Sequence, residues 1–546
     1  MTIRNPILRG FNPDPSIVRV DDDYYVATST FEWYPGVQIH HSRDLANWQL
    51  IARPLNRASQ LDMRGDPDSC GVWAPDLSYA DGRFHLVFTD VKRYGQTTVD
   101  GASGASMRDF HNYWVTADRI EGPWSDPVHL NSSGFDPALV HDDDGTSWPV
   151  NMLWDHRPGQ RRFAGIVIQE IDLATGALAG ERRLIFEGTA LGFTEGPHIY
   201  KRDGWYHLLV AEGGTERSHA VVMARSRSLF GPYGVHPDGP VLTALGTDRT
   251  TAHGVPTLQR TGHGDLVETP GGETWIVYLC GRPLPRGDRC VLGRETAIQR
   301  MIWGEDGWLR TADGHATPES EVALPGPINE ASGFASEHSD FASATTLPEA
   351  FQWLRTPYPD RIFSLDVRPG HLRLFGRETI GSHFTQALVA RRQQAFRYEA
   401  ETLVDFTPRH FQQAAGLVCY YNSTKFHYLH ITAGDDGHRQ IQILSAIPRE
   451  TGSSLLTQPM RIGPGPVALK VAVDYDTLRF AYRVVDASEW TWLPDVLDAS
   501  ILSDEATLPG MPNFTGTFVG MACQDMSGTG HPADFAHFRY TEFDEA

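Results

Sequence analysis

Asn12-Pro13-Asp14-Pro15 is the first of five short stretches that set one acidic residue in similar local surroundings. The other four are Trp73-Ala74-Pro75-Asp76, Phe135-Asp136-Pro137, Thr194-Glu195-Gly196-Pro197 and Gly262-His263-Gly264-Asp265. The acids recur about every 60 residues, and each precedes an apolar strand pattern, a polar turn and a second apolar strand. Such regular self-similarity indicates repeated supersecondary units. Five copies predict a ring, in which equivalent positions converge on the axis and several carboxylates face one pocket.

Hairpin signals follow the acids and predict the strand content of each repeat. Turns such as Asp81-Gly82, Asp203-Gly204 and Gly271-Gly272 stand between apolar runs, and these residues tolerate the positive φ of a tight hairpin. A further strand pattern recurs after the first four hairpins, and no long helical period occurs. Three or four strands per repeat predict an all-β fold with a five-bladed β-propeller. A barrel of hairpins is the alternative.

The repetition fades after about Pro325 and predicts a second domain. Residues 1–325 are expected to form the propeller, and the polar, small-residue stretch 326–350 is expected to be a linker. Residues 351–546 resume strand patterns without the acid motif, and their alternation and turn signals predict a β-sandwich. From the sequence, this second domain serves either for packing or for sugar binding.

Composition and charge exclude several classes of partner. Lys and Arg number 47 against 68 Asp and Glu, and the resulting net charge of −21 argues against nucleic acid and anionic membranes, which both select a basic face. No apolar run approaches the 18 or so residues of a membrane span, and the N-terminus lacks the apolar segment of a secretory signal. Five cysteines without zinc-binding spacing predict free thiols in a reducing compartment. We therefore expect a soluble cytoplasmic protein.

The local settings of the five acids separate chemical from structural candidates. Asp76 and Asp265 are expected to accept hydrogen bonds from neighbouring backbone and so hold blades together. Asp14, Asp136 and Glu195 are each surrounded by Pro, Gly or Phe. Glu195 has the longer side chain, and other carboxylates near it would raise its pKa. One protonated carboxylic acid and one ionised carboxylate are the two groups that glycoside hydrolysis needs.

Two functions compete on these residues, an acid/base hydrolase and a non-catalytic sugar-binding propeller. A sugar-binding propeller tends to repeat its site in every blade, whereas the neighbourhoods here differ, which favours one central site. His263 is expected near the axis, where it can bind substrate, help hold a hydrated cation such as Ca²⁺, or be a satisfied inner-strand histidine. No P-loop, nucleophile elbow or zinc-protease motif occurs. We expect no required cofactor and no dedicated metal ligands.

Longer motifs resemble those of the glycoside hydrolase family 43 β-xylosidases. They are residues 5–16, which contain Asp14, and residues 73–77, 193–197, 262–269 and 292–296. Residues 514–521, Phe-Thr-Gly-Thr-Phe-Val-Gly-Met, resemble the sandwich domain that accompanies this family. The resemblance therefore covers nearly the whole chain.

The resemblance implies a five-bladed propeller with a central pocket and a jelly-roll or concanavalin-like sandwich that contributes to the pocket wall. It implies an exo-acting, inverting xylan 1,4-β-xylosidase, which releases D-xylose from the non-reducing ends of β-1,4-xylo-oligosaccharides. An α-L-arabinofuranosidase side activity is expected, and a primary α-L-arabinofuranosidase is the alternative within the family. The family also implies a homo-oligomer, either a tetramer or a dimer.

The same resemblance assigns roles by motif. Asp14 would be the general base, Glu195 the general acid, and Asp136 the residue that orients the acid and keeps its pKa high. Arg294 would contact sugar hydroxyls and the surroundings of the base. The remaining pocket residues that the family implies are Phe31, Trp73, Thr215, His263 and, from the sandwich, Phe514, which would close one side and so enforce exo action.

Overall fold

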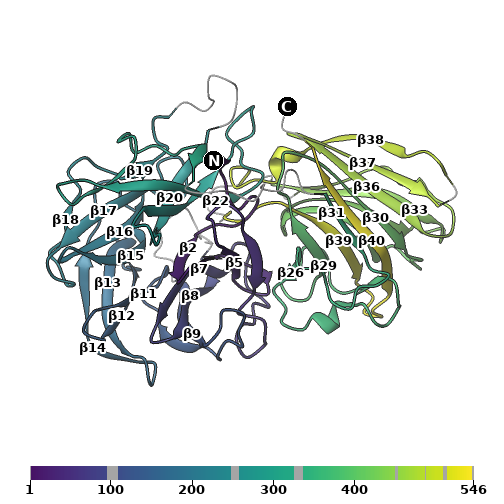
Figure 1. Ribbon diagram of the computed structural model, residues 1–546. Helices are drawn as coiled ribbons and strands as arrows, with labels where there is room; N and C mark the ends of the chain where they lie inside the picture. Colours follow the sequence, from purple (N-terminus) through teal and green to yellow (C-terminus); the bar gives the residue numbers. More distant parts are fainter. Residues whose placement is uncertain are drawn as a thin grey trace.

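Two β domains lie side by side in the computed structural model (Figure 1). It describes residues 2–94, 108–247, 257–324, 336–448, 453–485, 487–507 and 513–543. The propeller is drawn in purple to teal, and the sandwich in green to yellow. Within the described ranges the helices are the short 3-10 turns η1 (Pro359–Arg361) and η2 (Ala499–Ile501), and no helix there could cross a membrane. The all-β prediction is confirmed.

Five antiparallel sheets form the blades, which confirms the five-bladed propeller and rules out a single barrel. The first blade comprises β2 (Ser16–Val20), β3 (Asp23–Thr28), β5 (Gln38–Ser42) and β6 (Gln49–Ala52). The second comprises β7 (Gly71–Ala80), β8 (Arg83–Arg93), β9 (Asp109–Ala117) and β10 (Val128–Asn131). The third comprises β11 (Ala138–His141), β12 (Ser147–Trp154), β13 (Phe163–Asp172) and β14 (Ala177–Phe186).

The fourth and fifth blades complete the ring. The fourth comprises β15 (Glu195–Arg202), β16 (Trp205–Glu212), β17 (Ala220–Ser226) and β18 (Gly234–Val235), with β19 (Leu242–Thr243) also paired to β17. The fifth comprises β20 (Gln259–Glu268), β21 (Thr274–Gly281), β22 (Arg294–Trp303) and β23 (Leu309–Thr311). Each innermost strand packs against the next, and β20 packs against β2. The ring is therefore closed.

The N-terminal segment fastens this closure. Strand β1 (Thr2–Arg4) pairs with β24 (Glu321–Ala323), and Leu8 bridges Thr296 of the fifth blade. The side chain of Asn5 donates to the carbonyl of Ile298 at 2.7 Å and accepts from its amide at 3.0 Å. These contacts join the start of the chain to its last blade, so that residues just before β2 are held beside the axis.

Each repeat has a left-handed residue at one equivalent position, before the innermost strand in the first and third blades and inside it in the other three. The five residues and their φ angles are Asp14 (53°), Ala74 (38°), Asp136 (54°), Gly196 (55°) and His263 (47°). The expectation that all five acids share one position is therefore wrong. Asp14 and Asp136 are equivalent, Glu195 lies one residue earlier in its repeat, and Asp76 and Asp265 lie two residues later. Loops of unequal length hide such small offsets in a sequence period.

Two sheets form the sandwich that follows the propeller. The first runs β27 (Phe363–Ser364), β28 (Leu372–Phe375), β40 (Pro532–Glu542), β30 (Arg397–Asp405), β36 (Val467–Asp474), β37 (Thr477–Val484) and β38 (Thr491–Asp498), and β25 (Ser336–Asp340) pairs with β40. The second runs β34 (Ser453–Leu456), β33 (Arg439–Ile447), β32 (Lys425–Ala433), β31 (Gln413–Asn422), β39 (Phe518–Asp525), β29 (Ala387–Arg392), β26 (Phe351–Leu354) and β4 (Trp33–Tyr34), with β35 (Met460–Arg461) paired to β33.

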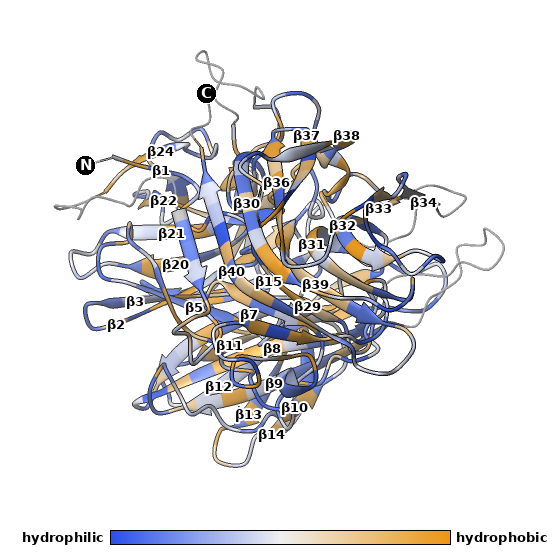
Figure 2. Cartoon of the chain, turned by 90° about the vertical axis from the view of Figure 1, so that its right-hand side faces the viewer, coloured by the Kyte–Doolittle hydropathy of each residue, from blue (hydrophilic) through white to orange (hydrophobic). Residues whose placement is uncertain are grey.

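Sequence alternation explains why these strands form a sandwich. Along β30 buried residues alternate with half-buried ones, and Figure 2 shows the matching change of hydrophobic and hydrophilic residues. Strand β25 lies inside residues 326–350, the stretch expected to be a linker. Its backbone pairs with β40, so this part of the stretch belongs to the sandwich sheet. Residues 326–335 of that stretch lie outside the described residues.

The two domains share one sheet and one apolar core. Strand β4, in the connection between β3 and β5 of the first blade, pairs with β26 and extends the second sandwich sheet. The fully buried Trp33 of β4 stacks on Phe518 of β39, with ring centroids 3.6 Å apart. Both residues belong to a buried cluster that also contains Phe11, Phe31 and Leu354. The propeller loops beside the axis are therefore packed directly against the sandwich.

Replacing the shared tryptophan tests this dependence. Trp33→Ala deletes a ring that is buried between the domains, and such large-to-small changes cost about 3–5 kcal/mol. We expect a matching fall in the urea midpoint, measured by tryptophan fluorescence and circular dichroism.

Trp492→Ala is the matched control, because Trp492 of β38 is 39 % exposed and lies under Arg479 at the sandwich surface. Its loss should change stability by only about 0.5 kcal/mol. Equal shifts in the two variants would show that the shared core does not join the domains energetically.

Candidate active site

Three carboxylates from three blades are buried around the propeller axis. Asp14 precedes β2, Asp136 precedes β11 and Glu195 begins β15, and their exposures are 5 %, 6 % and 7 %. The left-handed backbone at Asp14 and Asp136 sits immediately before Pro15 and Pro137, where each innermost strand starts. The blades therefore deliver acids that are far apart in the chain to one small volume.

Two side chains donate hydrogen bonds to the carboxylate of Asp14. Ser29 donates its hydroxyl to Oδ2 at 2.7 Å, and Arg294 donates from Nη1 to Oδ1 at 3.1 Å. Ser29 Oγ also accepts from the amide of Ala74 at 2.7 Å, which fixes the hydroxyl between the first two blades. Hydrogen bonds to a carboxylate and a nearby cation favour the charged form. Asp14 thus has the surroundings of a base.

Arg294 connects this carboxylate to the second domain. It begins β22 and is 3 % exposed, and its Nη2 donates to the carbonyl of Phe514 at 2.8 Å. Its guanidinium carbon lies 5.2 Å from the centre of the Phe31 ring and 5.7 Å from that of Phe514. The arginine therefore supports both a carboxylate and the aromatic wall.

Glu195 and Asp136 are coupled buried acids with raised pKa values. Burial, followed by the charges of Asp136 and Asp14, raises the pKa of Glu195 well above its usual value. Burial and the charge of Asp14 likewise raise the pKa of Asp136 to about 8. The amide of Gly196 donates to Asp136 at 3.1 Å, which favours negative charge on Asp136, whereas no such donor among the described residues lowers the pKa of Glu195. One acid of the pair is therefore protonated at neutral pH.

Aromatic side chains wall the space beside the carboxylates. The Phe31 and Trp73 rings lie 5.4 Å apart, and Phe514 stands 5.5 Å from Trp73 and 6.4 Å from Phe31. Tyr94 adds a ring 4.9 Å from Trp73. The structure thus brings the ring of Phe514, from the sandwich, against Phe31 and Trp73 of the propeller.

His263 and Thr215 lie at different distances from this centre. His263 Nδ1 is 3.9 Å from Asp136 Oδ2, and burial lowers the pKa of the imidazole to about 4, so that it is neutral. A Cβ on Gly196 would come 2.9 Å from the same nitrogen, so glycine leaves room for the ring. Thr215 is half-buried in the loop after β16, and no described hydrogen bond joins it to the three carboxylates.

A second polar layer lies two residues further along the innermost strands. Asp76 accepts from the amide of Leu139 at 2.9 Å, and Asp265 accepts from that of Ile17 at 2.7 Å. Ser16 Oγ donates to Asp265 at 2.9 Å. The prediction that Asp76 and Asp265 hold blades together through backbone hydrogen bonds is confirmed.

This layer also contains the candidate cation ligands among the described residues, Asp76, His198 and Asp265. Burial alone would lower the pKa of His198, but Asp265 and Asp76 raise it to about 9. A protonated imidazole thus occupies the place between two carboxylates whose oxygens already accept protein hydrogen bonds. Ca²⁺ prefers six to eight free oxygen ligands, and this donor set does not fit it. His263 is not a member of the group.

Sequence reasoning missed two side chains that shape the site. Ser29 and Tyr94 lie outside the recurring stretches, and no residue spacing connects either of them to an acid. Their positions relative to the strands could have pointed to them. Ser29 directly follows β3, two residues before Phe31, and Tyr94 directly follows β8. Both come at the end of a strand that pairs with an innermost strand.

Comparison with known proteins gives two domain matches that together span most of the chain. Residues 3–309 match glycosyl hydrolases family 43. Residues 338–541 match the beta xylosidase C-terminal concanavalin A-like domain.

Relatives and solved structures match over nearly full length. The chain is 52 % identical to "Xylosidase/arabinosidase 43B" of Humicola insolens, over 98 % of this chain and 97 % of that protein. It is 46 % identical to the "Beta-xylosidase" of Bacillus subtilis strain 168, over 99 % of this chain and 100 % of that protein. The crystal structure of a xylan beta-1,4-xylosidase from Bacillus halodurans C-125 superposes with a TM-score of 0.92 at 49 % identity, covering 99 % of this chain and 100 % of that one.

Proposed function

We propose a division of roles among three buried carboxylates, given that this chain belongs to glycosyl hydrolase family 43. The chain is a glycosidase. We propose that it is an exo-acting, inverting β-xylosidase, which releases D-xylose from the non-reducing ends of β-1,4-xylo-oligosaccharides. The names of the Bacillus relatives support this substrate, and that of the Humicola relative supports an α-L-arabinofuranosidase side activity.

The raised pKa values of the coupled acids Glu195 and Asp136, beside a third carboxylate that accepts from Arg294, are the observation that carries the proposal. Glu195, kept protonated by burial and by its carboxylate neighbours, gives its proton to the glycosidic oxygen. Asp14 takes a proton from a water molecule, and that water attacks the anomeric carbon from the opposite face of the sugar. The bond between the anomeric carbon and the leaving oxygen breaks. The electron pair of that bond stays on the oxygen, which has taken the proton from Glu195, and the product is α-xylose.

The remaining groups orient these two acids and enclose the sugar. Asp136 keeps the proton on Glu195, while Arg294 donates a hydrogen bond to Asp14 and would contact the sugar hydroxyls. Phe31, Trp73 and Phe514 would contact the apolar faces of the xylose ring, with Thr215 and His263 at the margin. A pocket closed by Phe514 admits a chain end and not a chain interior, which supports exo action.

The other functions receive less support. A sugar-binding propeller needs no acid with a raised pKa, whereas this site buries a coupled pair beside a third carboxylate. The five buried, free cysteines support a reducing compartment, and we keep a cytoplasmic location within the proposal. A homo-oligomer, either a tetramer or a dimer, likewise rests on the family resemblance. No cofactor takes part in the proposed chemistry.

Leaving-group dependence tests the role of Glu195. Protonation of the leaving oxygen matters for xylobiose, whose leaving alcohol is basic, but little for a dinitrophenolate. General acid catalysis supplies about 10²–10⁴-fold. Glu195→Ala should therefore lose activity on xylobiose by about that factor more than on dinitrophenyl β-xyloside, measured as kcat/KM. Equal losses on the two substrates would remove Glu195 from the role of acid.

The pH profile tests the role of Asp136. A negative neighbour raises the pKa of Glu195, so Asp136→Asn should lower that pKa. The enzyme loses activity as pH rises through the pKa of its acid, and the basic limb of kcat/KM should therefore move to lower pH in this variant.

Asp76→Asn provides the control, because Asp76 is also a buried axial aspartate but is not among the charges that raise the pKa of Glu195. It should lower thermal stability and keep the basic limb in place. A basic limb that stays at the wild-type pH in Asp136→Asn would contradict the assignment.

A further inference from the structure

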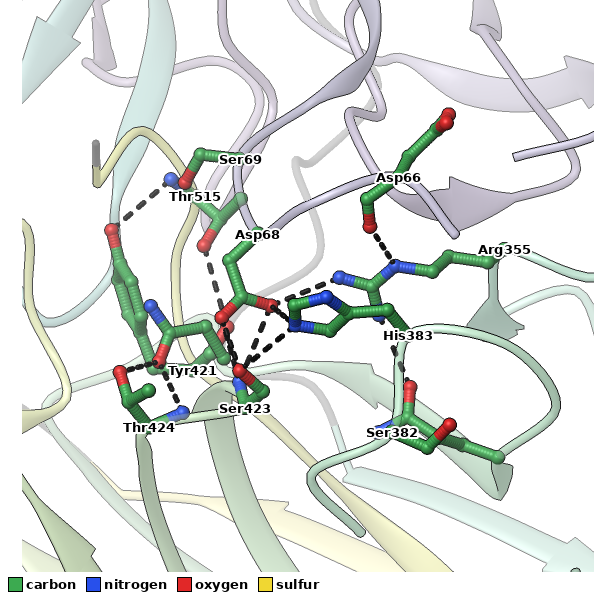
Figure 3. A network of polar contacts seen from close by, with 12 residues as sticks. Asp66, Asp68, Ser69, Arg355, Ser382, His383, Tyr421, Ser423, Thr424 and Thr515 are labelled. Atoms are coloured by element: carbon green, nitrogen blue, oxygen red, sulfur yellow. Dashed lines mark hydrogen bonds and ion pairs between the residues drawn. The ribbon is translucent and has the colours of Figure 1, made fainter. Parts of the chain in front are cut away.

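A fully buried arginine of the sandwich reaches into the propeller beside the pocket. Arg355 follows β26 directly, has a left-handed φ of 59°, and its side chain is 0 % exposed. Its Nη2 donates to Asp68 Oδ1 at 2.9 Å, and its Nε donates to the carbonyl of Asp66 at 2.8 Å (Figure 3). One side chain from the second domain thus holds two residues of one propeller loop.

That loop, residues 62–70, connects the outer edge of the first blade to β7 and is fastened to the sandwich at further points. Ser423 donates to Asp68 Oδ2 from its amide at 3.2 Å and also from its hydroxyl (Figure 3). His383 Nε2 lies 3.6 Å from Asp68, and its carbonyl accepts from the amide of Gly65 at 2.7 Å. Several hydrogen bonds therefore hold this propeller loop, which contains no proposed catalytic residue, against the sandwich.

Ser69, the residue after Asp68, connects this loop to the aromatic residues of the wall. Its carbonyl accepts from the indole nitrogen of Trp73 at 3.0 Å. Its hydroxyl accepts from the amide of Phe514 at 3.1 Å. The indole of Trp73 and the backbone amide of Phe514 therefore both donate to Ser69, the neighbour of the clamped aspartate.

Arg355 also holds the third wall residue through the backbone. Its amide donates to the carbonyl of Glu32 at 2.9 Å, directly after Phe31. Phe31 in turn exchanges two backbone hydrogen bonds with Val72, at 2.9 and 3.1 Å, beside Trp73.

We propose that Arg355 and Asp68 are positioning residues, an interdomain clamp that sets the shape of the sugar pocket by fixing residues 62–70. This inference deepens the proposed function and rests on it for the identity of the sugar. Neither residue touches the reacting groups. The clamp acts through Ser69 on Trp73 and Phe514, and through Glu32 on Phe31.

The chemistry of the clamp requires a carboxylate at residue 68. Burial would raise the pKa of Asp68, but the hydrogen bond with His383 and the charge of Arg355 hold it at about 2. One oxygen accepts from Arg355, and the other accepts from the amide and the hydroxyl of Ser423. An asparagine has the same shape, but its NH₂ group must face one of these donors. Asp68→Asn therefore opens the clamp with little change of volume.

The test compares Asp68→Asn with Arg289→Met. Arg289 joins the same two domains through Ser500 at 2.6 Å and Asp498 at 3.5 Å, and among the described residues no hydrogen bond joins its side chain to Phe31, Trp73 or Phe514. Each variant is assayed well below its melting temperature for kcat and KM on an aryl β-xyloside and for inhibition by D-xylose. Small displacements of pocket groups cost up to about 10²-fold. We expect kcat/KM of Asp68→Asn to fall about 10- to 100-fold, mostly through KM, and the Ki of xylose to rise in parallel.

Amide hydrogen exchange measures how firmly the clamp holds residues 62–73, and it needs no substrate. Amides of residues 62–73 should exchange faster in Asp68→Asn than in Arg289→Met, whatever sugar the pocket takes. Faster exchange in a chain that shows no xyloside turnover would support the clamp and count against the proposed substrate. Arg289→Met should keep wild-type kcat/KM.

Unchanged exchange, kcat/KM and Ki in a folded Asp68→Asn would overturn the proposal and leave Asp68 a purely structural residue. Ser69→Ala covers the case in which Asp68→Asn does not fold, because it removes only the hydroxyl that accepts from Phe514. It should raise the Ki of xylose, and an unchanged Ki in this variant would equally overturn the proposal.

Discussion

Three carboxylates that are buried together cannot all be ionised, and the site follows from this electrostatic constraint. Arg294 and Ser29 donate hydrogen bonds to Asp14, and the amide of Gly196 donates one to Asp136. The proton of the coupled pair therefore remains with Glu195, whose pKa burial and its neighbours raise. In the proposed division of roles, one arrangement of neighbouring groups therefore serves both the base Asp14 and the acid Glu195.

The second domain is part of this arrangement and not an appendage. Strand β4 extends a sandwich sheet, and the carbonyl of Phe514 accepts from the same arginine that contacts Asp14. The propeller supplies the acids, because its blades converge on an axis. The sandwich supplies one wall and the clamp that holds two others. A pocket made from both domains is complete only when they are packed together.

The sequence predicted the architecture correctly, but it did not predict which residues occupy equivalent positions in the five blades. Recurrence of acids before hairpin signals was enough for five blades, and family motifs pointed to Asp14, Asp136, Glu195 and Phe514. The period did not reveal that Asp76 and Asp265 sit two residues further in, because unequal loops absorb such offsets. Ser29 and Arg355 were missed, since their importance comes from pairs such as Arg355–Asp68, 287 residues apart, which no local pattern encodes.

The stereochemistry of hydrolysis tests the central claim, that Asp14 activates water and does not attack the sugar itself. Proton NMR of the anomeric region during the first minutes of β-xyloside hydrolysis records the product before it mutarotates. The account predicts that α-xylose appears first, since water enters opposite the leaving group. β-Xylose appearing first would mean a covalent intermediate, and it would contradict the role of Asp14 as a base.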